Sequence, residues 1–273
     1  MSSESRSTVS GSVFRALALL EFILGADTPP TTRELGQHFG IPPSSLAALL
    51  SALRGEGYLV STGGSITPGP RLMALGQLAC RHEIVVDIRT ALRLLVDRTG
   101  ETAFYSVEVP GPAGELGSVL PVEQIESPDE IRYVGILGRP RPLLQSMAGR
   151  VILAFSAREA DLRALLSRQD GPGHADRVLS ELNEIRRTGL ARYTTRPSDR
   201  IGTTTVAAPV LQNGRTIGAL SIAGPSARID ALADDLRTIF RDAQDVIEHK
   251  HPAGPSRRSV RWRPAAGDAA DDE

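Results

Sequence analysis

The stretch that decides the fold of the first part of the chain is TTRELGQHFGIPPSSLAALLSALRGEGYLV, residues 31–60. Thr31 and Glu34 match a capping box, in which a hydroxyl and a carboxylate satisfy each other's free backbone amides at a helix start. Gly40 then turns the chain, and the leucines of residues 46–53 recur at helical spacing. The pattern predicts two short helices joined by a tight turn.

The residues on either side complete a small domain. The segment 10–25 predicts a preceding helix, because its apolar residues recur at helical spacing. These residues are Val13, Leu17, Leu20 and Leu24. Residues 58–60 and 65–67 flank a Gly-Gly turn and predict a β-hairpin. Three helices and a hairpin indicate a winged helix-turn-helix, a DNA-binding fold, over residues 9–69.

The rest of the chain predicts a linker helix and a second domain. Pro70 suits a first helical position, and apolar periodicity continues far enough to predict one largely continuous helix over residues 70–100. Strand and helix patterns alternate over residues 101–250, which favours an α+β fold class with an α/β sensor-like domain. The expected strands are 102–107, 118–122, 204–211 and 216–222, and the expected helices are 148–156, 160–167, 175–187 and 229–248. The polar, charged residues 251–273 predict a disordered tail.

Composition limits the function classes. The 273 residues are 41% hydrophobic and 23% charged, with one cysteine and a formal net charge of −1. No apolar run approaches the roughly 20 residues that cross a bilayer, so we expect a cytoplasmic protein without membrane contact. Residues 1–76 carry five arginines and five acidic residues. A neutral domain releases few counterions and should bind double-stranded DNA weakly unless several copies act together.

Several separated segments carry a family resemblance. They are RELG (33–36), GIP (40–42), SS (44–45), MAGRVILA (147–154), IG (201–202), VAAPV (206–210) and ALSIAGP (219–225). In this order and spacing they resemble the IclR family of bacterial transcriptional regulators. The resemblance implies a GAF-like effector-binding domain at the C-terminal end, assembly as a homodimer or homotetramer, and control by a small-molecule effector such as an organic acid.

The second helix of a helix-turn-helix enters the major groove, so its polar face should reach bases and phosphates. The expected DNA-binding residues are Arg33, Ser44, Ser45, Ala48, Ser51 and Arg54. Family members commonly carry a lysine at the position of Pro43 and a polar group at Ala48, so both contacts are missing here. A sensor or dimerisation protein whose winged helix no longer binds DNA therefore stays open as the alternative.

Met147 and Ala148 precede or open a helix, where free amides and the positive dipole end favour an anion. The family's effector pocket uses this same point, and the resemblance places strand residues opposite it. The effector residues that it implies are Met147, Ala148, Thr203, Thr205, Ser221 and Ala223, with Thr195 aligned less directly. Threonines are also ordinary strand residues, and Arg139 and Arg141 could pair with an acidic effector or stay solvated.

Catalytic and metal sites have little support. No nucleophile–base set, phosphate-binding loop or carboxylate pair occurs at recognisable spacing. His249 and His251 lack an acidic or cysteine partner nearby, which is weak support for a metal. We expect no enzyme activity, no cofactor and no metal.

Overall fold

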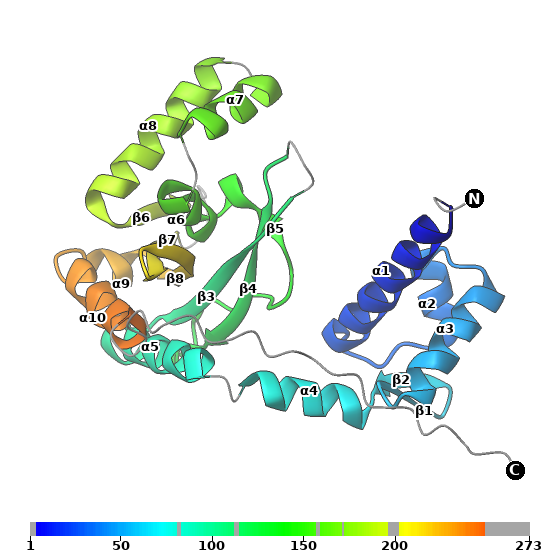
Figure 1. The fold of residues 1–273 in the computed structure, drawn as a ribbon. Helices are drawn as coiled ribbons and strands as arrows, with labels where there is room; N and C mark the ends of the chain where they lie inside the picture. The colour runs from blue at the N-terminus through cyan, green and yellow to red at the C-terminus, as the bar shows by residue number, and fades with distance from the viewer. Residues whose placement is uncertain are drawn as a thin grey trace, which may run out of the picture.

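A computed structural model describes residues 4–80, 83–111, 115–156, 159–170, 172–195 and 202–248. The expected tail, 251–273, and both histidines of the weak metal motif lie outside these ranges. The helices and hairpin of the N-terminal part lie apart from a larger α+β unit, with α4 (Pro70–Cys80) between them (Figure 1). No described helix is long and apolar enough to span a membrane.

The N-terminal part is a winged helix-turn-helix, as predicted. Its elements are α1 (Glu4–Gly25), α2 (Thr32–Phe39), α3 (Pro43–Gly55), β1 (Leu59–Thr62) and β2 (Ser65–Pro68). The capping box of α2 is formed, because the Glu34 amide donates to Thr31 Oγ1 over 3.3 Å and the Thr31 amide donates to Glu34 Oε2 over 2.7 Å. Leu46 and Leu50 of α3 are buried, so the leucine stripe faces the core.

The apolar side of α1 differs from the one that the spacing indicated. Val13, Leu17 and Leu24 are exposed, whereas Leu19 and Ile23 are buried in the core of this domain. Apolar residues occupy most of the circumference of α1, so their spacing predicts a helix without defining which side is buried.

The prediction of one linker helix over residues 70–100 is wrong for its second half. The structure has two helices there, α4 and α5 (Glu83–Thr99), on either side of residues 81–82, which lie outside the described residues. The second helix buries Ile88, Leu92 and Leu95 in the core of the larger unit. Its apolar stripe is therefore covered by its own domain, and among the described residues α4 is the helix between the two units.

The larger unit is built on one six-stranded antiparallel sheet in the order β5-β4-β3-β8-β7-β6. The strands are β3 (Thr102–Val109), β4 (Ser118–Ile125), β5 (Arg141–Pro142), β6 (Ala191–Thr195), β7 (Thr203–Gln212) and β8 (Arg215–Pro225). Asn213 and Gly214 both have positive φ, 53° and 72°, as a tight hairpin turn between β7 and β8 requires.

Helices cover both faces of the sheet (Figure 1). They are η1 (Leu143–Gln145), α6 (Met147–Ser156), α7 (Glu159–Asp170), α8 (Pro172–Thr188), α9 (Ser226–Ala231) and α10 (Leu236–Glu248), so the expected helix 229–248 is two helices. Alternate residues of β7 show the two layers: Val206 and Ala208 pack with α5 and α10, whereas Ala207 packs with α6. The fold class is α+β, as predicted.

Candidate effector cavity and DNA-binding face

A cavity of about 320 Å³ lies between the start of α6 and one face of the sheet. Its walls come from all six strands of the sheet, from the η1–α6 corner and from the segment between β4 and β5. Besides the residues expected from the sequence, the lining includes Phe104, Ser106, Val119, Pro121, Tyr133, Gly135, Ile136, Arg141, Gln145, Ser146 and Tyr193.

Strand register explains why these side chains meet. Thr205 lies opposite Ala223 of β8 and opposite Tyr193 of β6, so the three form one row across the sheet. Ser221 is two residues from Ala223 and lies opposite Phe104 of β3. Residues directly opposite one another, and residues two apart, project from the same face. The rows therefore build one wall that carries hydroxyl groups and aromatic rings.

Two hydroxyls of this wall are open to a ligand. Ser221 is buried and Thr205 half-buried, and among the described residues neither hydroxyl hydrogen-bonds to the protein. Both residues line the cavity, so a ligand or water there can satisfy these groups.

The start of α6 supplies the opposite wall. Ser146 is extended, and the first intrahelical bond runs from the Arg150 amide to the Ser146 carbonyl over 2.9 Å. The amides of Met147, Ala148 and Gly149 therefore have no intrahelical acceptor, as at every helix start. Gly149 allows α6 to sit against η1, because a Cβ there would overlap the Leu143 carbonyl oxygen.

All six effector residues that the resemblance implied line this cavity: Met147, Ala148, Thr203, Thr205, Ser221 and Ala223. Thr195 also lines it, opposite Thr203 in the register of β6 and β7. Of the two arginines before α6, Arg141 lines the cavity and Arg139 does not. Arg141 is the one charged residue in the lining within the described part of the chain.

Several lining residues were missed from the sequence, and two groups of them show why. Phe104 and Ser106 alternate in β3, so their shared face could be inferred once that strand had been placed. Tyr133 and Ile136 belong to a segment without regular structure, where no periodicity signals a site. The Tyr133 ring meets the Phe104 ring edge-on with centroids 5.9 Å apart, which brings this segment onto the cavity.

The expected DNA-binding residues are all exposed. Ser44, Ser45, Ala48 and Ser51 lie on α3, and Arg33 lies on α2. Arg54 is exposed near the end of α3, with its Nε donating to the Leu50 carbonyl over 3.3 Å. The exposed face of α3 thus carries mainly short side chains, several of them with hydroxyl groups.

Comparison with known families identifies both parts of the chain. The profile described as "Bacterial transcriptional regulator IclR C-terminal" matches residues 77–249, and the "IclR helix-turn-helix domain" profile matches residues 12–63. The chain belongs to the IclR family of bacterial transcriptional regulators. It is thus a DNA-binding regulator with an effector-binding domain.

Curated relatives of this IclR regulator are regulators too. The glycerol operon regulatory protein of Streptomyces griseus is 26% identical over 256 residues, which cover 89% of this chain and 97% of the relative. The HTH-type transcriptional regulator Rv1719 of Mycobacterium tuberculosis is 29% identical over 202 residues, 70% of this chain and 75% of that protein.

Solved structures share the fold. An IclR regulator from Alicyclobacillus acidocaldarius matches with a TM-score of 0.70 at 19% identity, covering 87% of this chain and 98% of the other. A homologue from Microbacterium hydrocarbonoxydans, crystallised with 4-hydroxybenzoate, matches with a TM-score of 0.68 at 20% identity and the same coverage.

One position that departs from the family pattern has a structural role. Pro43 occupies the first turn of α3, where proline is well tolerated because its fixed φ suits the helix and its missing N–H would have no partner. In this IclR regulator the proline therefore favours the start of α3.

Proposed function

We propose that this IclR regulator binds promoter DNA as an oligomer through α3 and the β1–β2 wing, under control of an anionic small molecule in the cavity. One observation carries the proposal. Six residues from three separate segments of the sequence, inferred as effector contacts, line a single cavity. The cavity combines free helix amides with hydroxyls and aromatic rings, as small-molecule sites commonly do.

The lining favours an organic acid as effector. A carboxylate would accept hydrogen bonds from the amides of Met147 and Ala148, where the positive end of the helix dipole stabilises negative charge. A polar group at the far end would meet Ser221 and Thr205, and Arg141 would attract the anion at the rim. The 4-hydroxybenzoate bound by the M. hydrocarbonoxydans homologue has this chemistry, a carboxylate and a hydroxyl separated by an apolar ring.

The linker α4 is fixed to the DNA-binding part. Arg71 Nη1 donates to Glu56 Oε2 over 2.5 Å, and the guanidinium lies 5.0 Å from the centre of the Tyr58 ring. The Gly69 amide also donates to the Tyr58 carbonyl over 2.7 Å. The start of α4 therefore moves with the winged helix-turn-helix. A ligand that favours one arrangement of the larger unit would then reorient the winged helix-turn-helix domains, the DNA-binding heads of the oligomer.

Footprinting and gel shifts on the promoter region upstream of the regulator's own gene test the proposal. We expect weak nonspecific binding, because the head is neutral, and protection of repeated half-sites by the oligomer. Adding 4-hydroxybenzoate and a panel of other organic acids should shift the footprint for at least one of them. If no upstream sequence is protected with or without any acid, the winged helix is a packing or dimerisation module instead.

A further inference from the structure

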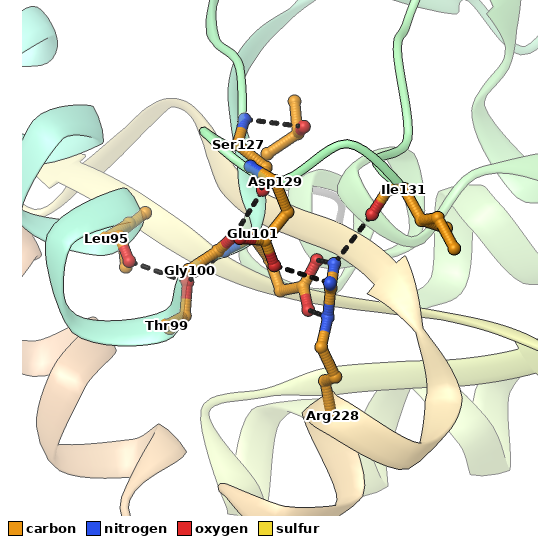
Figure 2. Close-up of polar contacts among 9 residues, drawn as sticks. Leu95, Thr99, Gly100, Glu101, Ser127, Asp129, Ile131 and Arg228 are labelled. Carbon is orange, nitrogen blue, oxygen red and sulfur yellow. Dashed lines mark hydrogen bonds and ion pairs between the residues drawn. The ribbon is translucent and has the colours of Figure 1, made fainter.

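An ion pair between a fully buried carboxylate and a half-buried arginine lies outside the cavity at the junction of α5, β3 and α9. The Glu101 side chain is 0% exposed, and Arg228 of α9 holds both of its oxygens. Arg228 Nε donates to Oε1 over 2.5 Å and Nη2 donates to Oε2 over 2.8 Å (Figure 2). A fully buried carboxylate is costly without such a partner, so this geometry fixes where the guanidinium lies.

The strand beside the pair is shaped to admit it. A Cβ at Gly224 of β8 would overlap Glu101 Oε2, so glycine is needed there for the carboxylate to fit. Gly224 follows Ala223, which lines the cavity, in β8. The ion pair is therefore built into the same strand that forms the hydroxyl-bearing wall.

Arg228 has further donors, and they reach the segment 126–137. Nη1 donates to Asp129 Oδ2 over 2.5 Å and Nη2 donates to the Ile131 carbonyl over 3.0 Å (Figure 2). One side chain thus joins buried Glu101, which lies between α5 and β3, to a segment that has no helix or strand of its own.

The start of that segment is attached at the same place. The Ser127 amide donates to Thr102 Oγ1 over 3.0 Å, and the Ser127 hydroxyl donates to the Gly100 carbonyl over 2.5 Å. Gly100 and Glu101 directly follow α5, which ends at Thr99. The segment is therefore bonded to the C-terminal end of α5.

The same segment closes one side of the cavity. Tyr133, Gly135 and Ile136 line it, and the backbone at Gly135 lies so close to Phe104 that a Cβ there would be 2.5 Å from ring atom Cε1. The exposed apolar side chains of the segment give it little core of its own. Its position therefore depends on the contact with Phe104 and on a small set of polar bonds, those of Ser127, Asp129 and Ile131 and one from the Gly135 amide to Gln124 Oε1 over 3.3 Å.

We propose that Arg228 is a positioning residue of the effector cavity, which holds the 126–137 wall against the C-terminal end of α5 through Glu101, Asp129 and Ile131. The proposal rests on the function proposed for the cavity, because only an effector-binding cavity gives this wall a regulatory role. A ligand that displaces Tyr133 or Ile136 would then strain the hydrogen bonds of Arg228. Through Glu101 it would also shift the C-terminal end of α5, the helix that follows α4.

Hydrogen–deuterium exchange of the full-length, ligand-free protein tests the positioning, so its result does not depend on finding an effector. Asp129→Asn keeps the buried pair and weakens only the bond to the wall, so exchange over 130–137 should rise about fivefold. Arg228→Gln should raise it more, about tenfold. The matched control is Asp230→Asn, which weakens an ion pair of the same helix with Arg192 and should leave 130–137 unchanged.

Two results would overturn the proposal. In one, both variants exchange over 130–137 like the wild type. In the other, Arg228→Gln raises exchange equally in α5, β3 and β8 while Asp129→Asn changes nothing. Arg228 would then serve only as the ionic partner of buried Glu101. If Arg228→Gln does not fold, Asp129→Asn alone decides the question, because it leaves Glu101 paired.

Discussion

Ala148 needs a small side chain if the cavity binds an effector. It is buried, its amide is one of the free donors at the start of α6, and its side chain lines the cavity. We expect Ala148→Leu to fill this space and abolish the shift of the footprint by the active acid, while DNA binding without ligand persists.

Ser221→Ala should have a milder effect and weaken effector binding by about 1 kcal/mol, the contribution of one neutral hydrogen bond. Calorimetric titration of both variants measures these effects.

A matched variant separates cavity filling from general overpacking. Ala154→Leu places the same side chain in the same helix, where Ala154 is also buried but does not line the cavity. Overpacking costs about 1–3 kcal/mol of stability at either site, but only Ala148→Leu should lose the ligand. Full effector response in a folded Ala148→Leu protein would place the binding site elsewhere.

Tyr105 makes stability sensitive to alkaline pH. Burial raises the pKa of its phenol to about 12, and the hydroxyl donates to the Ile217 carbonyl over 2.9 Å. The pKa in the unfolded chain is about 10, so between these values the unfolded chain loses its proton first. The free energy of unfolding should therefore fall as pH rises through this window, with a contribution of at most about 1.4 kcal/mol per pH unit from this group.

Urea unfolding at about pH 9 and about pH 11 measures this fall. Tyr105→Phe removes the titrating group, so the variant should lose less stability over the window, after an initial cost of about 1 kcal/mol for the missing hydrogen bond. Equal losses in the two proteins would show that Tyr105 does not contribute.

At the scale of elements, the short helix α2 depends on its cap. The Thr31 hydroxyl accepts from the Glu34 amide, and bonds from the Thr31 amide and hydroxyl lower the pKa of Glu34. Thr31→Ala should cost about 1 kcal/mol of stability and loosen α2, which carries Arg33. Thermal unfolding measures the cost, and Thr32→Ala, an exposed residue just inside the helix, is the control. Equal effects of the two substitutions would show that the cap contributes nothing.

The same elements show what the sequence could predict. Helices with a cap or a glycine stop and one clear apolar stripe were placed correctly, as α3 shows with Leu46 and Leu50. The role of α5 was missed, because periodicity reveals that a helix buries one face but not which surface covers it. Six residues of the cavity were implied by the family resemblance, which placed strand residues opposite the start of α6. Tyr133 could not be predicted, since it lies in a segment without periodicity whose place depends on tertiary contacts such as the one with Phe104.

At the scale of the whole molecule, exposed apolar side chains on two helices of the N-terminal half favour assembly. They are Val13, Phe14, Leu17 and Leu24 of α1 and Met73, Leu75 and Leu78 of α4. Most of the apolar stripe of α5 is covered by its own domain, so it leaves little surface for pairing. We therefore predict that the pairing surface lies on α4 and α1. A second copy is the natural cover, since most soluble oligomers are homo-oligomers with closed symmetry.

Assembly matters for DNA binding because one neutral head makes few ionic contacts, whereas two joined heads bind the second half-site as an intramolecular event. We predict a dimer or tetramer in sedimentation at micromolar concentration, weakened about tenfold or more by Leu78→Glu, since burying a leucine contributes about 1.5–3 kcal/mol. Gln77→Glu is the control, because it adds the same charge at the neighbouring exposed position without removing apolar surface. The weakened assembly should also lose protection of paired half-sites in footprinting.

A wild-type protein that sediments as a monomer would exclude this mechanism of DNA binding. Equal weakening by both substitutions would assign the effect to the added charge and not to the loss of Leu78.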